Sequence, residues 1–259
     1  MALLQAHSPL WHYLWVAPNV LLLLLAGMLL RRGSYGQYPA FLVFTIVGGS
    51  AELVAYSADL APGVTAEAWW RLLIMALLIE ALLKFAVLGE IFNRTFHVYE
   101  SLVRVAKIAV RILGALLLFA AAIAAAYAPP DGRFGIIARA HLLQQTTYVV
   151  ETGMLLFVFA FAAYFHIRLK RCFFGIALGL SISSCVHLAV WALIANGGLS
   201  NPVRERLEFL NMGAYHVAVL VWMYYLLVPP TIEQGGKPLR PPDGNVSGWN
   251  RELERLIKQ

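Results

Sequence analysis

The sequence has few charged residues. Only 13% of its 259 residues are charged and 60% are hydrophobic, whereas soluble domains are about 25% charged and about 45–50% apolar. A soluble domain of this length could not bury so much apolar surface, but a lipid bilayer can solvate it. The composition therefore predicts an integral membrane protein and excludes an ordinary soluble enzyme.

Cysteines and the signatures of common enzymes are also scarce. The two cysteines, Cys172 and Cys185, fall on one expected helix, too far apart to pair, so no disulfide framework is expected. The sequence contains no P-loop, dinucleotide fingerprint, GxSxG elbow or HExxH zinc motif. The formal charge of +6 does not indicate a nucleic-acid partner, because the basic residues sit mainly at helix ends, where they contact lipid headgroups.

Long apolar runs are abundant. Most of them reach the roughly 20 residues that a helix needs to cross a bilayer, and they do not alternate with the period of two that marks a β-strand. The pattern predicts an all-α polytopic membrane protein, with a seven-helix transmembrane bundle over residues 1–228. The expected spans are about 10–30, 38–60, 68–92, 103–127, 140–167, 172–196 and 207–228.

The basic residues predict how the bundle is oriented. Of the 20 lysines and arginines, thirteen fall on one side of these spans or in the tail and five on the other, which places the N-terminus outside and the C-terminus in the cytoplasm. Residues 229–259 form a Pro/Gly-rich linker and then an amphipathic helix, Ser247–Lys258. This helix either lies on the inner leaflet or docks on a protein partner. The sequence indicates no oligomeric state.

Ionisable side chains inside the spans mark a candidate site. A central charge costs roughly 2.5–3.5 kcal/mol in a bilayer, so such residues are functional candidates by default. Here they fall about 8–12 residues from the outer helix ends, close to the bilayer centre. The Ala-rich span 103–127 contributes none at that level and is expected to face lipid. The candidates for ligand binding or proton relay are Glu52, Glu80, Lys84, Glu151, Tyr148 and Asn19.

Two intramembrane histidines, His187 and His216, extend this layer. Together with Glu151 they are candidates for a transition metal, and two facing histidines would suit axial ligation of haem b. Structural roles stay open for all of them. Buried histidines are often hydrogen-bonded core groups, and Glu80 and Lys84, four residues apart, can neutralise each other. The expected convergence of three carboxylates and two histidines favours a site.

Several local motifs recur in a familiar order. They are YPAF at the start of the second span, GEIF at Gly89–Phe92, FFGIALG at the start of the sixth span, AYHVAVLVWMYYLL in the seventh and WNRELERL in the tail. Through these five motifs the chain resembles a group of bacterial seven-helix membrane proteins over nearly its whole length. The resemblance implies a bacterial inner-membrane location and a stand-alone seven-helix unit. It implies no activity, ligand or catalytic residue.

Three functions fit these patterns. The favoured hypothesis is a receptor-like or small-molecule-binding membrane protein, which binds in the polar Glu/His layer and acts through a cytoplasmic partner. The alternatives are a metal- or haem-binding membrane enzyme or redox subunit, and an accessory structural subunit of a membrane complex. A transporter is less favoured, because the sequence has no visible repeat and no paired broken helices.

Overall fold

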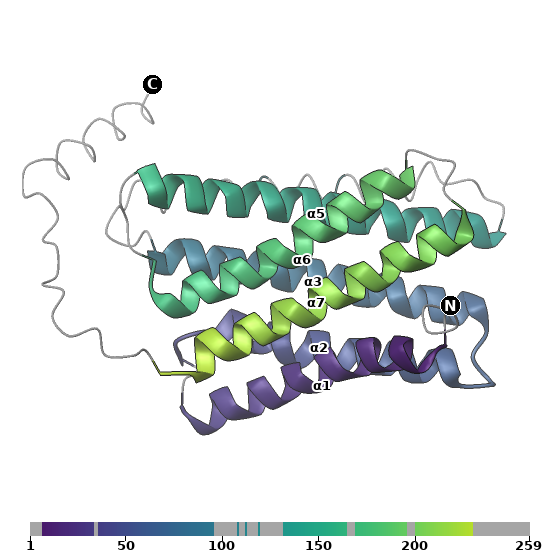
Figure 1. Ribbon diagram of the computed structural model, residues 1–259, viewed down its shortest axis with the longest axis horizontal. Helices are drawn as coiled ribbons and strands as arrows, with labels where there is room; N and C mark the ends of the chain where they lie inside the picture. The colour runs from purple at the N-terminus through teal and green to yellow at the C-terminus, as the bar shows by residue number, and fades with distance from the viewer. Residues whose placement is uncertain are drawn as a thin grey trace, which may run out of the picture.

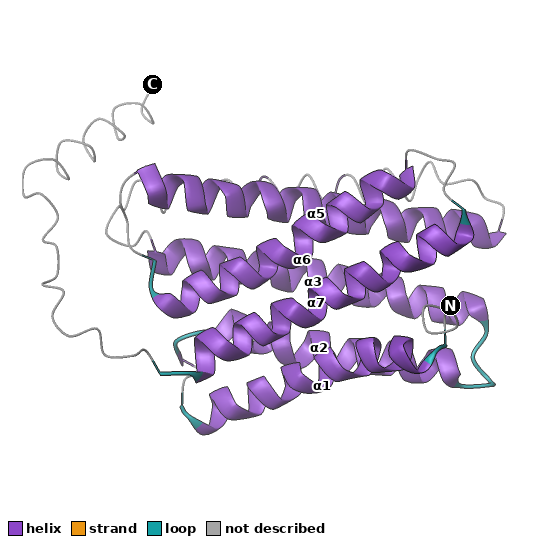
Figure 2. Ribbon diagram, viewed as in Figure 1, coloured by secondary structure: helices purple, strands orange, loops and turns teal. Residues whose placement is uncertain are grey.

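A computed structural model describes residues 7–33, 36–95, 132–164, 169–195 and 200–229, together with positions 108, 112 and 119, and most of these residues are helical. No strand occurs in these ranges (Figure 2). Six helices in them are long and apolar enough to cross a membrane, as expected for a multi-pass membrane protein (Figure 1). They are α1 (Pro9–Arg31), α2 (Pro39–Leu60), α3 (Ala66–Thr95), α5 (Gly132–Tyr164), α6 (Arg171–Ala195) and α7 (Asn201–Leu227).

The helices extend beyond several of the expected spans. The α7 helix begins at Asn201 rather than at 207, because Ser200 stands at the N-cap and a proline occupies the first turn. The α5 helix already includes Gly132, eight residues before the expected start at 140, and it is described as far as Tyr164. Hydropathy marks the part of a helix that lies in lipid, whereas caps mark where the helix ends. The expected span 103–127 and the tail helix Ser247–Lys258 lie outside the described ranges.

The six helices form a closed ring. Each packs against its neighbours in chain order, and α7 closes the ring against α1. The side chain of Arg32, just after α1, donates to the carbonyl oxygen of Leu227 at the end of α7 over 2.8 Å. These two helices therefore run in the same direction (Figure 1). Their starts lie at one end of the bundle and their ends at the other.

A second pair of neighbours, α3 and α5, also runs in one direction. Lys84 of α3 pairs with Glu151 of α5, and further along both helices the rings of Phe92 and Phe157 stack at 5.8 Å between centroids. Parallel neighbours cannot be joined by a short turn. The 36 residues between Thr95 and Gly132 therefore connect opposite ends of the bundle.

The apolar core fills one half of the bundle, which we call the closed half. Trp222 of α7 is 1% exposed and packs edge-on against Phe41 and Phe44 of α2. Its indole nitrogen donates to the Ile176 carbonyl oxygen of α6 over 3.1 Å. The other half of the bundle, toward the start of α1, holds candidate residues such as Glu52 and His187.

Glycines on α6 permit this close packing. A Cβ atom on Gly175 would overlap the Tyr225 side chain, and one on Gly179 would overlap the indole of Trp222. The small-residue stripe at four-residue spacing thus lets α7 aromatic side chains lie directly on the α6 backbone. The same face of α6 continues through Ser183 to His187.

Candidate functional site

A cavity of about 560 Å³ occupies the half of the bundle opposite the closed half. All six described helices contribute to its wall. Glu80, Tyr148 and His187 line it in mid-bundle, and the exposed side chains of Arg204 and Glu208 line it near the start of α7. Because its wall reaches exposed residues at the end where α1 starts, the cavity opens toward that end.

Glu52 of α2 faces this cavity without an ion-pair partner in the described ranges. The indole nitrogen of Trp15 donates to Glu52 Oε2 over 3.1 Å. One turn further along α1, Asn19 donates to the Trp15 carbonyl oxygen over 2.7 Å, and Tyr215 of α7 donates to Asn19 Oδ1 over 3.5 Å. This chain of contacts joins α2, α1 and α7 around one side of the cavity.

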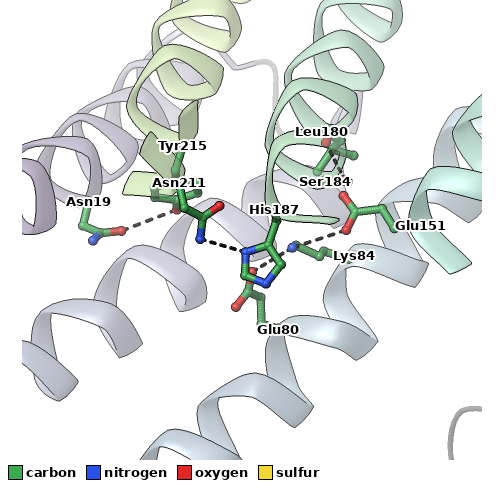
Figure 3. A network of polar contacts seen from close by, with 9 residues as sticks. All are labelled: Asn19, Glu80, Lys84, Glu151, Leu180, Ser184, His187, Asn211 and Tyr215. Carbon is green, nitrogen blue, oxygen red and sulfur yellow. Dashed lines mark hydrogen bonds and ion pairs between the residues drawn. The ribbon is translucent and has the colours of Figure 1, made fainter. Parts of the chain in front are cut away.

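A charged cluster lies at the deep end of the cavity (Figure 3). The Lys84 ammonium is 3.0 Å from Glu80 Oε1 and 3.3 Å from Glu151 Oε2. The side chains of Lys84 and Glu151 are only 6% and 1% exposed, whereas that of Glu80 is 24% exposed and lines the cavity. One cation therefore serves two carboxylates, one fully buried and one facing the cavity.

Tyr148 separates the Lys84 ammonium from the cavity space. The ammonium lies 4.1 Å from the centroid of the Tyr148 ring, a cation–π distance. The same ring stacks on His187 with 3.9 Å between centroids. Nδ1 of His187 is 2.8 Å from the amide nitrogen of Asn211 (Figure 3). This contact ties His187 of α6 to α7 beside the cavity.

The structure gathers most of the candidate residues but separates the two histidines. Five of the candidates line the cavity, namely Asn19, Glu52, Glu80, Tyr148 and His187. Lys84 and Glu151 lie next to these residues. His216 does not line it. Its ring lies 5.6 Å from that of Tyr13 on α1, because it is five residues beyond Asn211 and so about 140° around α7.

This separation bears on metal and haem binding. The described part of the chain holds no group of three or more histidine, cysteine, aspartate or glutamate side chains that could hold a metal ion. His187 has the Tyr148 ring against its face rather than a second imidazole across a gap. A haem held between His187 and His216 is therefore not supported by their placement.

The cavity wall also contains residues that sequence reasoning missed as site residues. Trp11 and Trp15 are aromatic-belt residues by position, yet both line the cavity, as do Trp69 and Trp191. A signal was present in α1, because Trp11, Trp15 and Asn19 recur every four residues on one helical face. For Trp69 and Trp191 no comparable pattern exists.

Comparison with family models, curated proteins and solved structures finds no match to this chain.

Proposed function

We propose that this protein is a seven-pass, receptor-like membrane protein that binds a small molecule in its intramembrane cavity. The cavity of about 560 Å³ carries this proposal. It has the size of a ligand pocket, which is typically about 300–1,000 Å³ and combines apolar walls with a few convergent polar groups. A polar layer with only a structural role would need no such space beside it.

Seven crossings are supported by the directions of the described helices. The α3 and α5 helices run parallel, so residues 96–131 have to return from one end of the bundle to the other. That stretch contains the apolar run 103–127, long enough for one more crossing. Seven crossings also agree with the parallel course of α1 and α7, which puts the two ends of the bundle on opposite sides of a membrane.

The basic residues support an outward-facing cavity mouth. The thirteen-to-five distribution of lysine and arginine favours an N-terminus outside the cytoplasm. The mouth, which lies at the end where α1 starts, then faces outward. In this proposal the ligand arrives from outside, and the signal leaves through the inner loops and the tail helix to a cytoplasmic protein partner. The bacterial inner membrane as location rests on the resemblance alone.

Two alternatives remain less well supported. A metal- or haem-binding enzyme would need ligands that face one another, and His187 and His216 do not. An accessory subunit would explain the tail helix, but it would not explain an open cavity lined by carboxylates. The binding function accounts for both the cavity and its polar wall.

Thiol accessibility tests the proposal. In a chain with Cys172 and Cys185 replaced by alanine, Ser183→Cys places a thiol on the cavity wall, where Ser183 is 8% exposed. A membrane-impermeant charged methanethiosulfonate should modify it when added outside intact cells. A matched variant, Leu156→Cys, places the thiol at a position 63% exposed on the bundle surface, where lipid should protect it.

A third variant makes a negative result interpretable. Ser200→Cys lies on the surface at the same end as the cavity mouth and should be modified from outside. Modification of Ser200→Cys but not of Ser183→Cys would show that the cavity is closed to solutes and would overturn the binding proposal. Modification of Ser200→Cys only in inverted vesicles would overturn the proposed orientation.

A further inference from the structure

The carboxylates around the cavity outnumber the basic side chains. Glu52, Glu80 and Glu208 line it, whereas Arg204 is the one lysine or arginine on the described wall. Lys84 lies behind Tyr148 and is already shared between two carboxylates. The deep part of the cavity thus has more carboxyl groups than lysines or arginines, and a buried carboxylate needs a counterion to stay ionised.

Glu52 and Glu80 lie across from each other between α2 and α3. Both also border a small gap between these two helices, together with Gly48 and Ala51. Glu52 is held in position by the Trp15 indole, and Glu80 by Lys84. Two anchored carboxylates on one side of a partly apolar cavity are arranged to receive a positive charge.

Aromatic rings form much of the remaining wall. Four of the chain's seven tryptophans line the cavity, with two tyrosines beside them. Their faces attract cations, most strongly where water is excluded. The Lys84 ammonium against the Tyr148 ring is an example of this contact within the same wall. The aromatic lining residues are Trp11, Trp15, Trp69, Trp191, Tyr148 and Tyr215.

We infer that the ligand is an organic cation, a protonated amine with an apolar body, whose ammonium group binds between Glu52 and Glu80 while the body packs against the tryptophans. This inference rests on the proposed binding function. A bare metal ion does not fit, because the space far exceeds one ion and rings rather than converging oxygens surround it. An anionic ligand does not fit, because the one lysine or arginine on the described wall lies at the mouth.

Paired probes test the charge requirement. Phenethylammonium and phenethyl alcohol share a ring and chain and differ in the charged group. Each is titrated into the full-length protein in lipid nanodiscs, with tryptophan fluorescence as the readout and empty nanodiscs as the correction for partitioning. Since carboxylates and ring faces both favour the cation, we expect the amine to bind at least about tenfold more tightly than the alcohol.

Glutamine variants locate the charge. Glu52→Gln keeps the shape and an oxygen acceptor for the Trp15 indole, and it should weaken amine binding about tenfold while leaving alcohol binding unchanged. Glu67→Gln is the matched control. Glu67 lies on α3 like Glu80, but it is exposed, paired with Arg71 and outside the cavity. This variant should bind both probes like the unchanged protein.

The outcomes separate this inference from the function on which it rests. Equal affinity for both probes, or amine binding unaffected by Glu52→Gln, overturns the cation assignment. If Gly48→Leu, which fills the cavity, still abolishes binding in that case, the binding site itself stands. If neither probe binds, or if Gly48→Leu changes nothing, the cavity is not the amine site. Thiol modification of Ser183→Cys then shows whether the cavity is open to solutes.

Discussion

Replacing Lys84 with methionine removes the positive charge that neutralises the most buried carboxylate of the bundle. Lys84 and Glu151 are 6% and 1% exposed, and no other lysine or arginine in the described ranges pairs with Glu151. Methionine keeps the length of the side chain and its packing against Tyr148. The substitution therefore tests the charge with little change in volume.

The magnitude follows from the burial of the two partners. Removing one member of a buried pair typically costs about 3–5 kcal/mol, because the other charge stays buried without compensation. Lys84→Met should thus lower the stability of the bundle by about this amount. Glu80→Gln should cost at most about 1 kcal/mol, since Glu80 is partly exposed and Lys84 keeps Glu151. The double variant Lys84→Met/Glu151→Leu should recover most of the loss, because no buried charge remains unpaired.

The assay is reversible denaturation of the purified protein in mixed micelles, followed by tryptophan fluorescence or circular dichroism. Lys84→Met, Glu151→Leu and the double variant form a double-mutant cycle, from which the coupling energy between Lys84 and Glu151 is obtained. A Lys84→Met protein as stable as the unchanged one would refute the reasoning. So would a double variant less stable than either single variant.

Two further predictions concern glycines. Gly179→Ala should destabilise the bundle by about 1–3 kcal/mol in the same denaturation assay, because its Cβ would overlap the Trp222 indole. Gly213→Ala is the control and should be neutral or slightly stabilising, because a Cβ there has no neighbouring atom within 4 Å. Gly48→Leu should slow thiol modification at Ser183→Cys at least about tenfold, because both positions line the cavity and the added side chain takes up part of its space. Gly153→Leu, which lies outside the cavity wall and has no neighbouring atom within 4 Å, should leave that rate unchanged. Equal effects of both members of either glycine pair would contradict the packing described here.

The sequence was sufficient to predict where polar residues gather, because their depth in each span can be counted. Glu52, Glu80 and His187 come from three helices at similar depths, and all line one cavity. Depth does not give the direction in which a side chain points around its helix. This is why His216 lies against Tyr13 and not in the cavity wall.

The cavity itself could not be predicted from the sequence. In the closed half α6 and α7 lie close together, because Gly179 leaves room for the Trp222 side chain. Beyond that point residues of both helices, such as His187, line the cavity. Such approach distances arise from pairs of side chains on different helices, and residue spacing along one helix does not encode them. The same limit applies to Trp11 and Trp15 near the start of α1, because an aromatic belt at the membrane surface and a cavity wall look alike along the chain.

The ionisable residues of the mid-membrane layer divide into two groups with different roles. Lys84 and Glu151 pair with each other and do not line the cavity, so a structural role accounts for them. Glu52 faces the cavity and accepts a hydrogen bond from the Trp15 indole, but no lysine or arginine in the described ranges forms an ion pair with it. Glu80 belongs to both groups, because it binds Lys84 and lines the cavity.

A cation beside Glu80 would compete with Lys84 for that carboxylate, so cavity occupancy and the buried pair are expected to be coupled. Glu52→Gln should therefore alter ligand affinity at nearly unchanged stability, Lys84→Met should chiefly alter stability, and Glu80→Gln alone should alter ligand affinity and the Lys84–Glu151 coupling energy together.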